Sequence, residues 1–92
     1  MKRKELKEAP ERTDAYNDEI LSLLDGLGIV AREEGHLVAV SRDSMVEKFP
    51  EDGEEKSYAL TLQQIRLALP NKLYIIWAGK TDDDYFVEVY IR

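Results

Sequence analysis

The spacing of apolar residues predicts an amphipathic helix near the start of the chain. Between positions 16 and 27 these residues recur with helical spacing, which places them on one face. Thr13 is a suitable N-cap, because a threonine hydroxyl accepts a hydrogen bond from a free amide of the first turn. Gly26 and Gly28 provide the end, since glycine readily adopts the left-handed conformation that terminates helices. We therefore expect a helix over about 13–26, with an apolar face formed by Tyr16, Ile20, Leu23, Leu24 and Leu27.

Two pairs of β-prone runs predict two hairpins. The first pair, residues 29–32 and 36–42, flanks the sequence EEGH, where Gly35 can take the positive φ of a tight turn. The second pair, residues 72–78 and 85–91, flanks a polar turn with three consecutive aspartates. Both runs of the second hairpin are apolar on both faces, whereas a strand with one solvated face alternates between apolar and polar residues. The second face of this hairpin is therefore a candidate contact surface.

Alternation along the last hairpin divides its side chains into two sets. One set is expected to form the core beneath the helices and consists of Leu73, Ile75, Trp77, Val87, Val89 and Ile91. The other set is rich in aromatic residues and poor in charge, as interaction surfaces often are. We assign partner binding to this second set, which consists of Tyr74, Ile76, Phe86, Glu88, Tyr90 and Arg92.

The middle of the chain supports two interpretations. In DSMVEKFP, Met45, Val46 and Phe49 fit either a turn of helix or a continuation of the preceding strand. Pro50 ends whichever element forms, and EDGEE has the composition of a turn. The charge run within residues 43–56 is interpreted as a solvated loop.

A second helix is expected before the last hairpin. Thr61 and Gln64 have the spacing of a capping box, in which each side chain bonds a free amide near the other. Leu62, Ile65 and Leu69 share a helical face, and a proline at position 70 ends the element. We expect a helix over about 61–69, preceded by a short strand at 57–60.

These elements predict an α+β fold. Their order is α-β-β-(β or short α)-α-β-β, with an antiparallel sheet of four to five strands and two helices packed on one face. A chain of 92 residues forms one domain. We expect that domain to span 13–92 and to follow a basic, flexible arm at 1–12.

Composition narrows the classes of function. The chain has no cysteine, which excludes disulfides and thiolate sites. The basic N-terminus lacks the apolar stretch of a secretory signal, and no apolar run approaches the roughly 20 residues of a membrane span. We expect a cytoplasmic protein that contacts no membrane.

The charge is acidic, with a formal net value of −6. Residues 13–42 carry six acidic and two basic groups, and residues 43–56 carry the same numbers. Such a charge disfavours nucleic acid as a partner, because that binding depends on lysine and arginine contacts to phosphate. The positive segment is the arm at 1–12, with five basic and three acidic groups.

Candidate catalytic and metal-binding residues are sparse. His36 is the single histidine and is interpreted as a surface residue of a turn or strand. Asp82, Asp83 and Asp84 are adjacent, whereas calcium loops space their ligands at alternate positions, so a solvated turn is expected. Ser41 and Ser44 lack the surroundings of a nucleophile. We expect no enzyme activity, no metal and no cofactor.

Three functions remain as hypotheses. The first is an interaction domain that binds another protein or a second copy of itself, as an inhibitor or adaptor. In one form of this hypothesis its acidic surface imitates nucleic-acid phosphates. The second is a nucleic-acid binder that uses the aromatic strand face with Lys2, Arg3, Lys4 and Lys7. The third is a small enzyme with an unrecognised carboxylate site.

Overall fold

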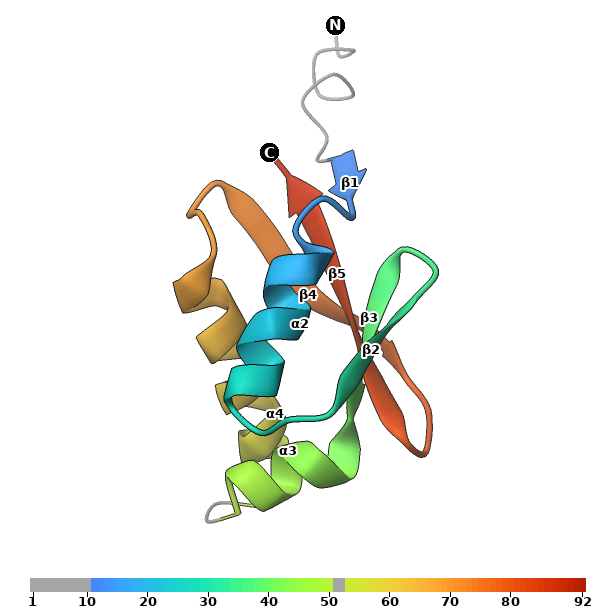
Figure 1. The fold of residues 1–92 in the computed structure, drawn as a ribbon, viewed down its shortest axis with the longest axis vertical. Coiled ribbons are helices and arrows are strands. Elements are labelled where there is room, and N and C mark those ends of the chain that lie inside the picture. Colours follow the sequence, from blue (N-terminus) through green and yellow to red (C-terminus); the bar gives the residue numbers. More distant parts are fainter. Residues whose placement is uncertain (1–10, 51–52) are drawn as a thin grey trace, which may run out of the picture.

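The computed structural model describes residues 11–50 and 53–92 and shows an α+β fold (Figure 1). Three helices pack against one curled antiparallel sheet of five strands. The predicted fold class is therefore confirmed.

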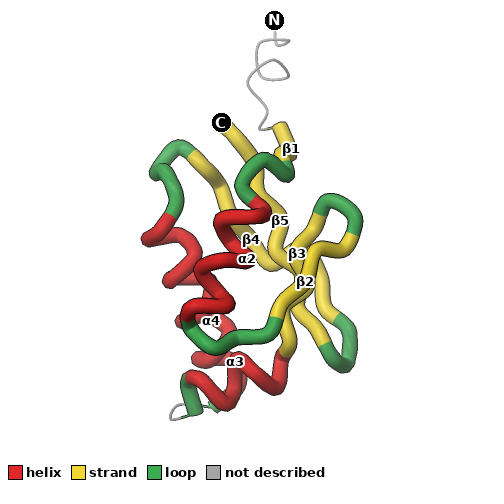
Figure 2. The backbone as a smooth tube through the Cα atoms, viewed as in Figure 1, coloured by secondary structure: helices red, strands yellow, loops and turns green. Residues whose placement is uncertain are grey.

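The last strand is the centre of the sheet. β5 (Asp84–Ile91) pairs along one side with β4 (Leu73–Lys80). Along its other side β5 pairs first with β3 (Leu37–Ser41) and then, nearer its end, with β1 (Glu11–Thr13). β2 (Ala31–Glu34) lies outside β3. The outer strands of the sheet are thus β4 on one side of β5 and, on the other side, β2 beyond β3 and the short β1 beside the end of β5 (Figure 2).

The helices cover one face of the sheet. They are α2 (Asn17–Gly26), α3 (Arg42–Lys48) and α4 (Glu54–Ala68). Among the described residues no helix has the length and apolarity that crossing a membrane requires. The core between helices and sheet is apolar and consists of Ile20, Leu24, Ile29, Val38, Val40, Met45, Tyr58, Leu62, Ile65, Leu69, Leu73, Ile75, Val87 and Val89.

The predicted inner face of the last hairpin is the face that the helices cover. Four of its six side chains are buried, and Trp77 and Ile91 are half-buried against the same core. Tyr74 lies opposite Tyr90 in the register, and Ile76 lies opposite Glu88. Because alternate side chains point to opposite faces, this second set faces away from the helices.

The predicted layer of two helices is corrected to three, because the segment that the sequence left open between a strand and a short helix forms the short helix. α3 begins after Ser41, whose side chain accepts a hydrogen bond from the Ser44 amide at 3.2 Å. The Ser44 hydroxyl donates to the Ser41 carbonyl and accepts from the Val30 amide, both at 3.0 Å. These serines therefore cap a helix and attach its first turn to the loop between α2 and β2.

The predicted start of the second helix is also wrong. α4 begins at Glu54, so there is neither a strand at 57–60 nor a capping box at Thr61. Thr61 is fully buried inside the helix, and its hydroxyl donates to the Ser57 carbonyl at 2.9 Å. The Ser57 hydroxyl in turn donates to the carbonyls of Gly53 and Phe49. Each hydroxyl finds a backbone acceptor one turn earlier, which removes the cost of burying it inside a helix.

The first helix starts later than predicted. Residues 11–13 form β1, and Thr13 accepts a hydrogen bond from the Ala15 amide instead of capping a helix. α2 ends at Gly26 as predicted, and Gly28 has a φ of +80°. Glu11 and Arg12, which were assigned to the arm, belong to the sheet, while residues 1–10 lie outside the described residues.

Candidate functional site

The six residues predicted to bind a partner lie together on the face of the sheet opposite the helices. We call this set the outer face, and it comprises Tyr74, Ile76, Phe86, Glu88, Tyr90 and Arg92. Tyr74 is 43% exposed and its ring centre lies 6.2 Å from that of Tyr90. Arg92 is exposed, and the remaining four side chains are half-buried. The outer face therefore offers aromatic surface to solvent at the β4 side of the sheet.

Glu88 lies on the outer face and contacts three other side chains. Its carboxylate accepts a hydrogen bond from the Tyr90 hydroxyl at 2.8 Å and lies 3.4 Å from Arg12 Nη1. His36 Nε2 lies 3.5 Å from the same carboxylate, so a protonated imidazole forms a third contact. The bond to Glu88, with partial burial and the negative charge of Glu88, raises the pKa of Tyr90 above its ordinary value.

His36 lies at the β2–β3 turn, with its side chain 45% exposed, in keeping with its interpretation as a surface residue. Its backbone carbonyl accepts a hydrogen bond from the buried Asn17 side chain at 3.2 Å. This bond fixes the turn against α2 and so holds the imidazole over Glu88.

β4 presents a row of backbone groups that no strand in the described chain pairs with. The Leu73 amide donates to the Pro70 carbonyl, and the Ile75 carbonyl accepts from the Arg66 side chain. Both groups therefore point away from β5, and the period of two along a strand gives Trp77 the same orientation. We call the amides of Ile75 and Trp77, with the Trp77 carbonyl, the free edge.

A cleft with basic residues lies at the beginning of β4. It encloses about 360 Å³ and is lined by Arg66, Pro70, Asn71, Leu73, Tyr74, Ile75 and Arg92. We call it the basic cleft. It adjoins both the outer face, through its tyrosine, and the free edge, through Ile75.

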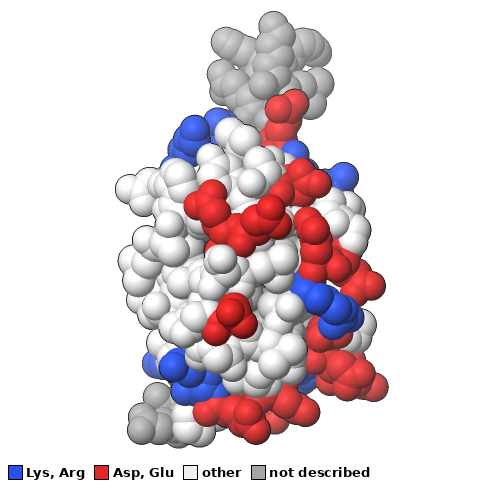
Figure 3. Space-filling model, in the orientation of Figure 1, with Lys and Arg blue, Asp and Glu red and all other residues white. Residues whose placement is uncertain are grey.

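Acidic side chains dominate the view from the helix side (Figure 3). They gather over α2, along the β2 edge and around α3, whereas basic side chains form smaller groups near the end of β5, on the β2 side and at the lower end of the molecule. The lining of the basic cleft, with two arginines and no acidic side chain, contrasts with the net charge of −6 of the chain.

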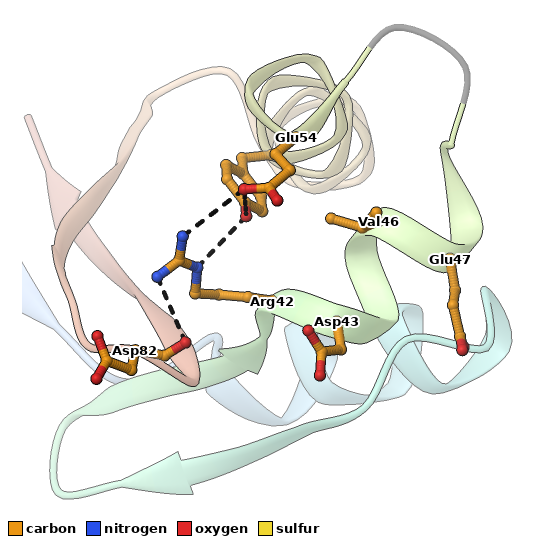
Figure 4. Close-up of a pocket in the computed structure, with 7 residues that line it drawn as sticks. Arg42, Asp43, Val46, Glu47, Glu54 and Asp82 are labelled. Carbon is orange, nitrogen blue, oxygen red and sulfur yellow. Dashed lines mark hydrogen bonds and ion pairs between the residues drawn. The ribbon is translucent and has the colours of Figure 1, made fainter.

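A second cleft surrounds Arg42, where α3, α4 and the β4–β5 turn meet (Figure 4). It encloses about 450 Å³ and contains four carboxylates. Arg42 donates to the Tyr58 hydroxyl at 3.3 Å and to the Thr81 carbonyl at 2.9 Å, and it lies 3.9 Å from Glu54. The bond with Tyr58 raises the pKa of the Arg42 guanidinium above its ordinary value. Arg42 thus joins three elements of the fold.

The Arg42 cleft does not bring its carboxylates together. Figure 4 shows Asp43 and Glu47 on separate turns of α3, with Asp82 across the cleft beyond Arg42. In residues 11–50 and 53–92 no three histidine or acidic residues are placed to hold a metal ion. A paired acid and base would need two such groups in contact, and this geometry offers an arginine clamp instead.

The three aspartates of the last turn divide into two kinds. Asp82 and Asp83 are exposed, as the prediction of a solvated turn requires. For Asp84 that prediction is wrong, because it is buried at the start of β5 and accepts two hydrogen bonds from Arg32, at 3.4 and 3.1 Å. The bond to Asp84 raises the pKa of the Arg32 guanidinium.

Sequence reasoning did not identify Arg66 or Asp84 as important. Arg66 reaches β4 because α4 packs beside that strand, and an arginine in the last turn of a helix gives no local sign of such a contact. Asp84 resembles its neighbours in sequence, and only the pairing of β3 with β5 brings it near Arg32. The one available signal was alternation, which sets Asp84 on the same face as Phe86 and Glu88.

The chain shows no match to known protein families, to curated proteins or to solved structures.

Proposed function

We propose that this domain binds another protein by accepting an extended segment of that protein along the free edge of β4. The observation that carries the proposal is the free edge itself, on a strand of eight residues with the sequence LYIIWAGK. Unpaired backbone groups on such a strand are a template for another strand, and peptide recognition by strand addition uses this feature.

The outer face supplies side-chain contacts to the same segment. A strand added beside β4 places alternate side chains next to Tyr74 and Ile76. Tyrosine offers a large contact area with a polar tip, which suits a surface that is wet in the free state and buried in the complex. The backbone of β4 would provide affinity, and the outer face would select the sequence of the segment.

The charges favour a different protein over a second copy of this chain. Antiparallel pairing of two β4 strands centred on Ile76 brings Lys80 of one copy close to the start of the other copy's β4, where Lys72 lies next to the strand. Like charges opposite each other destabilise a strand pair. Such a pairing also requires both copies of Arg66 to release the Ile75 carbonyl.

Nucleic acid is the weaker alternative for the outer face. Its aromatic rings suit base stacking, but Glu88 places a carboxylate among them. The arm residues Lys2, Arg3, Lys4 and Lys7, on which this alternative depends, lie outside the described residues. Binding of a protein strand would use the unpaired backbone groups of the free edge. Base stacking would use the aromatic rings alone and would give these backbone groups no role.

The experiment compares the domain with a variant whose free edge is blocked. Wild type, Ile76→Lys and the β2-edge control Glu34→Lys are immobilised and exposed to extract of the source cells. A charge on an edge strand discourages pairing, so a strand-adding partner should be retained by wild type and Glu34→Lys and lost by Ile76→Lys.

The bound partner is then located on the domain by amide hydrogen exchange. In the free domain the Ile75 and Trp77 amides should exchange faster than those of Tyr74 and Ile76, which point towards β5. In the complex they should become protected. Protection confined to β2 or to the helices would contradict strand addition at β4.

A further inference from the structure

The free edge stops abruptly at the basic cleft. Beyond Trp77 towards the start of β4, the Ile75 carbonyl is occupied by Arg66 Nε and Nη2, at 3.2 and 3.0 Å. The Leu73 amide is occupied by the Pro70 carbonyl at 3.1 Å. A segment that pairs with the free edge therefore finds the next carbonyl and the next amide of β4 already occupied.

Arg66 also changes the chemistry that the edge presents. Where a strand would normally offer its carbonyl, β4 offers a guanidinium that is already held in place by two hydrogen bonds. Arginine is a donor with no acceptor, so an amide of the incoming segment cannot pair there and an acceptor can. In the described part of the chain, Arg66 Nη1 donates to no protein group.

Arg92 brings a second positive charge to the same cleft. Its guanidinium carbon lies 5.3 Å from the centre of the Tyr74 ring, an arrangement that orients the guanidinium by stacking. The residues that line the cleft include both arginines and no acid. Two oriented guanidinium groups without an acidic neighbour match a carboxylate, for which arginine provides paired donors.

The direction of the incoming strand decides which carboxylate reaches the cleft. Antiparallel pairing is slightly more stable per residue than parallel pairing. A segment antiparallel to β4 runs towards residue 73, and so its C-terminal end approaches the cleft. Since the Ile75 carbonyl and the Leu73 amide are already occupied, a chain that finishes there forgoes neither of these two hydrogen bonds.

We propose that the basic cleft binds the C-terminal carboxylate of a protein partner whose last residues pair with the free edge. Arg66 and Arg92 hold the carboxylate, and Ile75 and Trp77 hold the residues that precede it. This inference rests on the strand addition proposed above and adds that the segment is the end of a chain.

Three peptides and one small anion test the inference. The peptides are a short acetylated sequence of alternating threonine and valine with a free C-terminal carboxylate, the same peptide amidated, and an amidated peptide whose last residue is glutamate. Acetate is titrated against chloride at equal ionic strength. Binding is followed by the fluorescence of Trp77, the single tryptophan, and by the NMR shifts of the Trp77 amide and the Arg66 Nε–H group.

The peptide with the free carboxylate should bind about tenfold more tightly than the amidated one, the scale of a hydrogen-bonded charge pair that is partly exposed. Arg92→Gln, an exposed position, should remove most of that difference. The control Lys48→Gln removes an equal charge from α3, far from β4, and should leave the difference unchanged. The amidated peptide that ends in glutamate should bind like the other amidated peptide.

The remaining outcomes separate this inference from the proposed function. Equal binding of all three peptides at Trp77 would overturn the carboxylate site and leave strand addition standing. Preference for the glutamate peptide would mean that the basic cleft binds an acidic side chain and not the end of a chain. Shifts of Arg66 with acetate, without any peptide at Trp77, would overturn strand addition. No saturable shift with any probe would overturn both.

Discussion

The two edges of the sheet differ in length, in polarity and in the use of their charges. β2 has four residues, and three of them are exposed. Its arginine, Arg32, lies 2.9 Å from Glu34 and 3.1 Å from Asp84. β4 has eight mostly apolar residues, and the arginines beside it meet no carboxylate in residues 11–50 and 53–92.

This difference indicates that one edge is protected and the other is available. Short strands with charged side chains are a common protection against edge-to-edge pairing, and β2 has both features. At β2 the charges satisfy each other, whereas at β4 the guanidinium of Arg66 satisfies only a backbone carbonyl. The edge that contributes most to the core is therefore also the edge open to a partner.

The largest expected effect concerns the contribution of each edge to stability. Ile75 is 3% exposed, so Ile75→Ala should lower the free energy of unfolding by about 3 kcal/mol, as loss of a buried isoleucine side chain does. On the other edge, Glu34→Ala removes an exposed side chain and should change it by less than about 0.5 kcal/mol. Urea denaturation measures both. Equal losses would show that β2 carries as much of the fold as β4.

The next effect concerns how β2 is fastened to the sheet. Asp84→Asn removes the charge that pairs with Arg32 and should cost about 1 kcal/mol, less than a fully buried pair because the Arg32 side chain is 58% exposed. The matched control is Asp83→Asn, in the exposed turn, which should have no measurable effect. Thermal unfolding of the two variants gives the comparison, and similar losses would contradict a special role for Asp84.

The two faces of the last hairpin could be predicted from the sequence, whereas the boundaries of two helices could not. The two faces of the β4–β5 hairpin were predicted because alternation is a local rule, and each side chain follows from its neighbours. α3 remained one of two alternatives and the start of α4 was misplaced, because hydroxyl residues serve both as caps and as buried groups bonded to the preceding turn. Thr61 is of the second kind, and only packing against the sheet decides between them.

The residues of the candidate site also differ in whether the sequence could predict them. Tyr74 and Tyr90 could be placed on one face from spacing alone. Arg66 and Asp84 gain their roles from residues far away in the sequence, through the packing of α4 beside β4 and of β3 beside β5. No local pattern specifies such contacts, so sequence reasoning found the surface and missed the charges that define its limits.

A charge reversal tests whether like charges keep two free edges apart. The wild type should scatter light as a monomer of 10.6 kDa. Lys80→Glu brings the introduced glutamate close to Lys72 of a second copy in pairing centred on Ile76, so it should favour dimers at high concentration. Lys48→Glu makes the same change of charge on α3 and should leave the protein monomeric. A dimeric wild type would contradict the argument, and dimers in both variants would assign association to net charge alone.

The smallest effect concerns the charge at the centre of the outer face. The hydrogen bond to Glu88 raises the pKa of Tyr90 above its ordinary value of 10.0. A raised pKa in the folded state means that the protonated tyrosine stabilises the fold below about pH 10, and that this contribution is lost as the pH rises through the folded pKa. NMR titration of the tyrosine rings should show Tyr90 ionising later than a free tyrosine.

Glu88→Gln is the variant that tests this account. The amide still accepts a hydrogen bond but carries no charge, so the pKa of Tyr90 should fall towards its ordinary value, whereas the control Glu33→Gln should leave it unchanged. An unchanged pKa in Glu88→Gln would mean that the negative charge of Glu88 does not contribute to the increase. Because the Glu88 carboxylate already meets Tyr90, Arg12 and His36, it presents no unpaired negative charge to an approaching chain end. Its loss should therefore alter the titration of Tyr90 far more than the affinity for a peptide that ends in a carboxylate.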